Sequence, residues 1–231
     1  MPPGMMSGRA IGQGILANQM LNVELLYSVM IIAICLVIYF KTKEIYDLSS
    51  HKGIKYFRYT FLFFAFAFAL KYLSKYFFPF FIQNGLIELT FFLSMLILLL
   101  TLYTTLMAGI YLINSLSSKK DHILLWHLIA LCISILAILT NVYLTYILPQ
   151  IALLIYGFAV LYSNYKKSRS KKHQDSYIIY LLLLIFWLVS IIDLFIPNFL
   201  QLAQLIIYLI STGLFLAIFY KVVKRIGSNS K

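Results

Sequence analysis

The chain has 231 residues, of which 62% are hydrophobic and only 11% are charged. Soluble domains hold about 45 to 50% apolar residues, so this composition excludes a large soluble catalytic or nucleic-acid-binding domain. The net charge of +12 then belongs to the ends of membrane helices, where Lys and Arg meet anionic lipid headgroups. The expected partner is the lipid bilayer, with no nucleic acid.

Seven long apolar segments follow one another along the chain. Because a membrane helix needs about 20 apolar residues, they predict helices at 21–40, 57–78, 86–112, 123–140, 143–164, 177–196 and 200–220. Only Thr140 and Asn141 separate the fourth from the fifth. One helix of about 40 residues would be twice the thickness of a bilayer, so we predict a tight turn at Asn141. The expected fold is an all-α integral membrane protein with a seven-transmembrane-helix bundle.

The basic residues are distributed unevenly over the connections between these helices. The connections 79–85, 141–142 and 197–200, which are every second connection, contain no Lys or Arg. The positive-inside rule therefore predicts the N-terminus outside, the C-terminus cytoplasmic and a multi-pass location in the cell membrane. The residues on the basic side are Lys41, Lys43, Lys52, Lys55, Arg58, Lys119, Lys120, Lys166, Lys167, Arg169, Lys171, Lys172, Lys221, Lys224, Arg225 and Lys231.

The chain divides into three expected parts around this bundle. Residues 1–20 are rich in Gly and Met and lack the features of a cleaved signal peptide, which favours a flexible extracellular leader. The transmembrane domain is expected over 21–220, followed by a basic cytoplasmic tail over 221–231. The longest basic connection, Lys41 to Lys55, mixes charged and apolar residues. We expect a short amphipathic helix there on the membrane surface, and the alternative is that the segment docks a partner.

Ionisable residues inside membrane helices are costly and are therefore candidate functional groups. Five ionisable residues qualify: Glu24, Lys71, Lys75, Glu88 and Asp193. With the predicted topology all five fall in the outer leaflet, where the three carboxylates and two ammonium groups could pair. The functional interpretation is an outward-facing cavity that binds a small polar ligand; the alternative is that the side chains reach to water or brace the bundle. The candidate ligand-binding residues are Lys71, Lys75, Glu88, Asp193, Glu24 and Gln204.

Two helices also carry strips of polar residues. On the third predicted helix, Thr90, Ser94, Thr101 and Thr105 recur at spacings of four, seven and four, which places them on one face. On the seventh helix the corresponding residues are Gln201, Gln204, Tyr208 and Ser211. Such strips either let helices approach and form hydrogen bonds across their interface or line a polar cavity.

The sequence lacks a pattern for a metal, a cofactor or catalysis. Cys35 and Cys132 lie in apolar runs without a CxxC spacing, and we expect both to be small buried hydrophobes. His122 and His127 are five apart, which does not suit zinc ligation. No nucleophile, phosphate-loop or kinase motif occurs. We therefore expect no metal, no cofactor and no enzyme.

Two further features concern aromatic residues and a proline. Tyrosines near the predicted helix ends, Tyr27 and Tyr39 among them, indicate an interfacial aromatic belt. Pro149 beside Gln150 removes one backbone hydrogen bond from the fifth helix and predicts a bend near its outer end.

Two functional classes remain open on these observations. The first is a receptor-like or accessory seven-helix membrane protein, with an outward-facing polar site and basic cytoplasmic loops that contact a protein partner. The second is a small-solute transporter with alternating access. Because the intramembrane charges are all expected on the outer side and the inner halves offer little beyond threonines, the asymmetry favours the receptor-like hypothesis.

Overall fold

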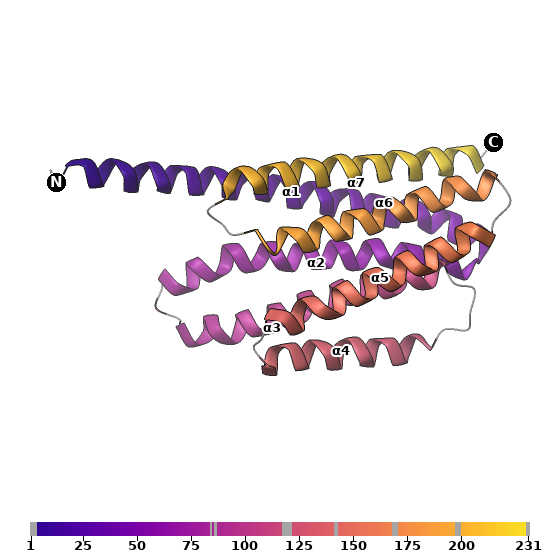
Figure 1. Ribbon diagram of the computed structural model, residues 1–231, viewed down its shortest axis with the longest axis horizontal. Helices are drawn as coiled ribbons and strands as arrows, with labels where there is room; N and C mark the ends of the chain where they lie inside the picture. The colour runs from indigo at the N-terminus through magenta and orange to yellow at the C-terminus, as the bar shows by residue number, and fades with distance from the viewer. Residues whose placement is uncertain are drawn as a thin grey trace.

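The computed structural model describes residues 4–83, 85, 87–116, 122–140, 143–167, 171–196 and 200–229. Within these ranges the chain forms seven helices and nothing else that is regular. The helices are α1 (Gly4–Ser49), α2 (Lys52–Gln83), α3 (Ile87–Leu116), α4 (Ile123–Thr140), α5 (Tyr143–Lys167), α6 (Lys171–Asp193) and α7 (Gln201–Asn229). They run side by side in a single elongated bundle (Figure 1).

Neighbour contacts arrange six of the helices in a closed ring. The order around the ring is α1, α2, α3, α5, α6 and α7, with α7 returning to α1. α4 lies outside the ring and packs on α3 and α5 (Figure 1). Since α4 contacts only two helices, much of its surface is left exposed, with Leu124 78% and Leu139 76% exposed.

The helices have the length and composition of membrane spans. Six contain a stretch long and apolar enough to cross a bilayer, within the part of the chain that the structure describes. The apolar part of α6 runs only from Tyr177 to Asp193, about 25 Å at 1.5 Å per residue. The exposed leucines of α4 are the expected lipid contacts. The fold is thus an all-helical bundle of the multi-pass membrane type.

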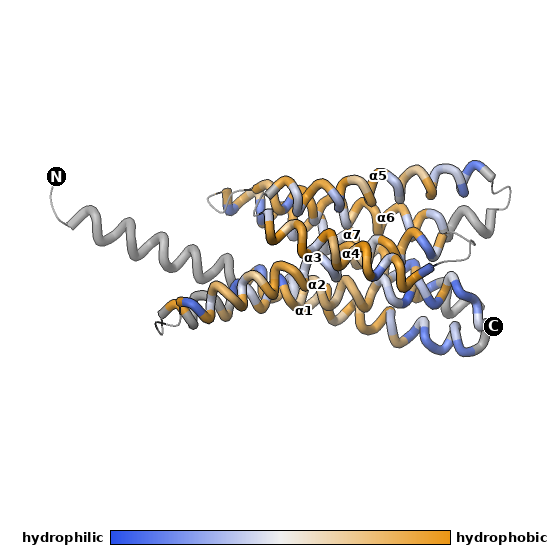
Figure 2. The backbone as a smooth tube through the Cα atoms, turned by 90° about the horizontal axis from the view of Figure 1, so that it is seen from below, coloured by the Kyte–Doolittle hydropathy of each residue, from blue (hydrophilic) through white to orange (hydrophobic). Residues whose placement is uncertain are grey.

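We call the end of the bundle that carries the α1–α2, α3–α4 and α5–α6 connections and the C-terminal end of α7 the basic end. The other end, with the α2–α3, α4–α5 and α6–α7 connections, we call the opposite end. Hydrophilic residues gather at the basic end, while the middle of the bundle is hydrophobic (Figure 2).

The predicted helix boundaries hold best where polar residues stop the apolar run abruptly. α4 covers Ile123–Thr140 as predicted, and α5 begins at Tyr143; the predicted turn at Asn141 lies outside the described residues. Several other helices are longer than predicted, because polar residues continue a helix beyond its apolar part at no cost in water or headgroups. The predicted leader, residues 1–20, is helical from Gly4, and its side chains lie outside the description.

The predicted surface helix between Lys41 and Lys55 is wrong as a separate element. α1 continues without a break to Ser49, and α2 begins at Lys52. The chain reverses over Ser50, which has a φ of 51°, and His51. The amide of Ser50 bonds to the Tyr46 carbonyl at 2.7 Å, and the Gly53 amide donates to His51 Nδ1 at 3.1 Å. These two caps satisfy helix-end groups, so the reversal needs only two residues.

The core of the ring is aromatic and closely packed. Phe61, Phe64 and Phe68 of α2 meet Phe186 of α6 and Phe215 of α7 in a continuous set of ring contacts. Phe186 and Phe215 have ring centroids 4.6 Å apart. This aromatic layer, as we call these five residues, fills the middle of the ring, and each member is buried.

Pro149 lies inside α5, which continues through it as one helix. Proline lacks a backbone donor and therefore leaves a carbonyl of the preceding turn without its usual partner. The adjacent Gln150 is buried and its Nε2 donates to the Tyr146 carbonyl at 3.2 Å. The predicted bend stays a prediction.

Candidate functional site

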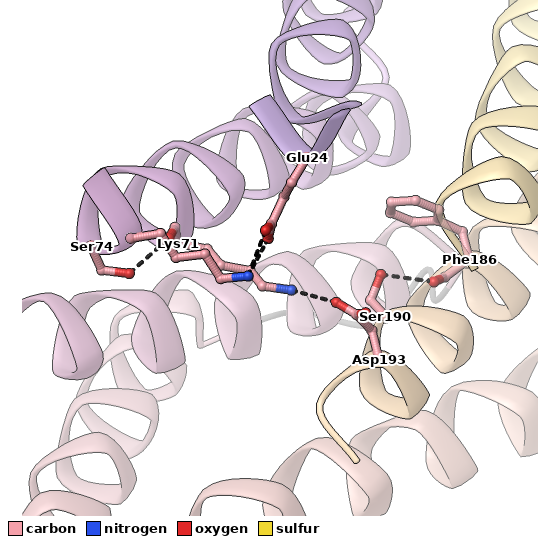
Figure 3. Close-up of polar contacts among 7 residues, drawn as sticks. Glu24, Lys71, Ser74, Phe186, Ser190 and Asp193 are labelled. Carbon is pink, nitrogen blue, oxygen red and sulfur yellow. Dashed lines mark hydrogen bonds and ion pairs between the residues drawn. The ribbon is translucent and has the colours of Figure 1, made fainter. Parts of the chain in front are cut away.

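Two ion pairs near the opposite end join three helices. The Lys71 ammonium of α2 lies 2.7 Å from Asp193 Oδ2, on the last residue of α6. The Lys75 ammonium, one turn further along α2, bonds to both carboxylate oxygens of Glu24 on α1, with Oε2 at 2.6 Å. Figure 3 shows the Lys71 side chain reaching to Asp193, with the Glu24 carboxylate close by in the same view. Lys71 and Lys75 thus point from one face of α2 to two different neighbours.

The two members of each pair differ in exposure. The side chains of Asp193 and Glu24 are 10% and 14% exposed, while those of Lys71 and Lys75 are 30% and 39% exposed. The carboxylate side chains are therefore more covered than the lysine side chains that they pair with. Lys71 donates one bond to Asp193, and an ammonium group has three donors, so this lysine retains donors for another acceptor.

A pair of tyrosines continues the site towards the middle of the bundle. The rings of Tyr27 on α1 and Tyr208 on α7 stack with centroids 4.8 Å apart, and both residues are buried. The Tyr208 hydroxyl lies beside Glu24, and the Tyr27 hydroxyl lies beside Ser211. Tyr27 also contacts Phe68 edge to face at 5.9 Å. The aromatic layer therefore begins directly beneath these polar groups.

Tyr27 does not belong to the predicted interfacial belt. It is 7% exposed, because it lies three residues after Glu24 and faces the same interior side of α1. That spacing is visible in the sequence, and an acidic residue followed by a tyrosine on one helix face is the signal that could have placed Tyr27 in the site.

The six predicted ligand-binding residues do not all come together. Glu24, Lys71, Lys75 and Asp193 form the two pairs, which we call the ion-pair site. Gln204 lies on α7 one turn before Tyr208 and is half-buried. Glu88 is exposed in the first turn of α3, where the helix dipole stabilises a negatively charged carboxylate. It makes no ion pair with any residue that the structure describes.

The polar strip of α3 is satisfied within its own helix. The hydroxyls of Ser94, Thr101 and Thr105 donate to the carbonyls of Phe91, Ile97 and Thr101, each at 2.7 Å. Thr90, at the start of the strip, is buried. Hydroxyls bonded to the preceding turn in this way need no partner on another helix, so these bonds leave both interpretations of the strip open.

His127 occupies a place that sequence reasoning missed. The Tyr103 hydroxyl is 2.7 Å from Nδ1 of His127, and the Tyr111 hydroxyl is 3.0 Å from its Nε2. Both tyrosines lie on α3, and the imidazole joins α4 to them. Two phenols at eight-residue spacing and one histidine on the next helix give no recognisable motif, so only the packing of α4 on α3 brings them together.

The described residues contain no group of three or more His, Cys, Asp or Glu placed to hold a metal ion. Cys35 is buried as predicted, whereas the prediction for Cys132 is wrong because it is exposed. α4 buries only a narrow face, made of Ala130, Ser134 and Ala137, and Cys132 lies off that face.

Comparison with known proteins places the chain in a family. It is 32% identical over 218 residues to an uncharacterized protein of Archaeoglobus fulgidus, an alignment that covers 88% of this chain and 92% of that protein. The chain therefore belongs to the same family as the Archaeoglobus protein. No protein-family model matches the chain, and no solved structure matches it.

Proposed function

We propose that this member of the Archaeoglobus protein's family is a non-enzymatic, receptor-like membrane protein whose ion-pair site takes a small polar ligand with an anionic group. The observation that carries the proposal is the difference in exposure within the pairs. The carboxylate side chains are largely covered, and the side chains of Lys71 and Lys75 are more exposed. A carboxylate or phosphate is the chemistry that two such neighbouring ammonium groups recognise.

The aromatic layer supports a one-sided site. Tyr27 and Tyr208 lie beneath the ion pairs, and Phe64, Phe68 and Phe186 follow in direct ring contact. A transporter must open its site alternately to both sides, whereas a receptor needs only an accessible site on one side. The packed layer leaves the charged groups at one end of the ring, which favours the receptor-like proposal over a carrier.

We further propose that the ion-pair site faces outside and that the basic end is cytoplasmic, where it contacts a protein partner. The distribution of Lys and Arg supports this orientation in the cell membrane through the positive-inside rule. The ion pairs connect α1, α2 and α6, and these three helices continue to the basic end. A ligand that competes with the carboxylates for the lysines therefore changes contacts among all three helices. That continuity provides a route from the site to a partner.

The orientation is tested by cysteine labelling in intact cells. Asn84→Cys, in the α2–α3 connection, is expected to react with an impermeant maleimide, and Ser168→Cys, in the α5–α6 connection, is expected to react only after the cells are permeabilised. Both positions lie outside the described residues and are chosen from the chain order. The exposed Cys132 is first replaced by Ser in both variants. If Ser168→Cys alone is labelled in intact cells, the orientation is the opposite of the one proposed.

The ligand class is tested by thermal unfolding of the purified chain in lipid nanodiscs. Small carboxylates and inorganic phosphate are compared with chloride at equal ionic strength. A ligand at 100 times its Kd stabilises by about 2.7 kcal/mol, so at least one anion should raise the Tm clearly. The rise should disappear in Lys75→Gln and persist in Lys221→Gln, a charge removal at the basic end.

Two outcomes would contradict the proposed function. An anion that stabilises Lys75→Gln as strongly as the unchanged chain acts elsewhere, and the ion-pair site is then not its receptor. Uptake of the stabilising anion into vesicles that contain the chain, but not into empty vesicles, would show transport and replace the receptor-like proposal with a carrier.

A further inference from the structure

A second charged site lies at the basic end, between α1 and α2. The guanidinium carbon of Arg58 on α2 is 4.5 Å from the centre of the Tyr39 ring and 5.9 Å from that of Tyr46, both on α1. At these distances the face of an aromatic ring attracts a cation. The two tyrosines thus hold the guanidinium in place, and we call these three residues the arginine cradle.

Arg58 has hydrogen-bond donors that no described residue accepts. A guanidinium has five N–H donors in its plane, and none of them bonds to any residue that the structure describes. The Nε atom is buried without a partner. A cation–π contact does not take the place of a hydrogen-bond acceptor, so the cradle holds the group without satisfying its donors. An unsatisfied buried donor is costly and indicates an acceptor from outside the chain.

The charged residues around the cradle indicate that this acceptor is an anion. Lys43, Lys52 and Lys55 are exposed on the same two helices. Glu44 and Asp47 of α1 are exposed as well, but neither forms an ion pair with Arg58. The Thr42 hydroxyl donates to the Ile38 carbonyl at 2.6 Å. The cradle therefore presents an unpaired guanidinium within a basic neighbourhood, and an anion is the matching ligand.

We propose that the arginine cradle binds the phosphate of an anionic membrane lipid. Arg58 is six residues from the start of α2, about 9 Å along the helix axis, which suits the depth of lipid headgroups at the basic end. Phosphate oxygens accept two parallel bonds from one guanidinium, and tyrosines lie at the same interfacial level in membrane proteins. Basic pockets between membrane helices bind such headgroups.

Native mass spectrometry of the full chain in detergent, titrated with short-chain phosphatidylglycerol, tests this proposal. Arg58→Gln is expected to weaken binding at least tenfold. Arg58→Lys keeps the charge but loses the planar fork, and its affinity should fall between the two. The matched control is Lys224→Gln, because Lys224 is also at the basic end and lies 5.9 Å from the Tyr220 ring; its affinity should change less than twofold.

Three results would overturn the proposal. The first is an equal loss in Arg58→Gln and Lys224→Gln, which would indicate general charge attraction. The second is equal binding of phosphatidylcholine, which would show that the anionic headgroup is not selected. The third is competition by inorganic phosphate at concentrations as low as those of the lipid, which would assign the cradle to a soluble anion. If Arg58→Gln does not fold, Tyr39→Leu replaces it and should weaken binding at least threefold.

Discussion

Replacing Gly109 by Ala is expected to cost about 3 kcal/mol of folding stability, the upper end of the range for overpacking a core. A Cβ atom at Gly109 of α3 would lie 2.2 Å from Cη2 and 2.6 Å from Cζ3 of Trp187 on α6. Trp187 is 1% exposed, so its ring has no free space to move into. Glycine here allows an indole to lie directly on the backbone of a neighbouring helix.

The measurement is unfolding of purified chains in mild detergent with increasing denaturing detergent, followed by circular dichroism. Gly213→Ala is the matched control, because Gly213 is also inside a helix and a Cβ there meets nothing within 4 Å. That control should be neutral or stabilising by up to about 1 kcal/mol, since Ala is the better helix former. In a Trp187→Leu background, Gly109→Ala should lose most of its effect. Equal behaviour of the two glycine variants would show that the contact is not tight.

The second large effect is expected at the ion-pair site. Lys71→Ala leaves the Asp193 carboxylate, 10% exposed, without its cation. Breaking a fully buried pair costs about 3 to 5 kcal/mol. Because the Lys71 side chain is 30% exposed, water screens part of the interaction, and we expect a loss of about 1 to 3 kcal/mol.

A second variant separates the loss of the pair from the loss of packing. Lys71→Met with Asp193→Asn removes both charges and keeps most of the side-chain volume, so it should recover more than half of the loss in the same unfolding measurement. Lys75→Ala should cost less than Lys71→Ala, because Lys75 and Glu24 are both more exposed than their counterparts. Unchanged stability in Lys71→Ala would show that the lysine only reaches to the surface and does not brace α2 against α6.

The polar residues were harder to place from the sequence than the apolar ones. Lys71 and Lys75 are four residues apart, so their shared face on α2 follows from helical geometry alone. Their partners lie 122 and 51 residues away in the chain, and nothing local selects Asp193 or Glu24 over Glu88. Glu88 and Asp193 lie at the ends of α3 and α6, and Glu24 lies inside the long α1, yet all three carboxylates are nearer the opposite end of the bundle. The choice among them depends on which helices are neighbours.

The order of the helices by itself was determined by the sequence, because long apolar runs must form helices to satisfy their backbone in a membrane. The break between α4 and α5 follows in the same way, since a bilayer limits helix length. Only the tertiary structure decided that six helices close a ring with α4 outside it. Gly109 against Trp187, Arg58 between two tyrosines and Lys71 beside Asp193 all result from that closure. The physical reason is that large apolar side chains lie on the exposed faces of these helices as well as on the buried ones, so side-chain shape and pairing select the neighbours.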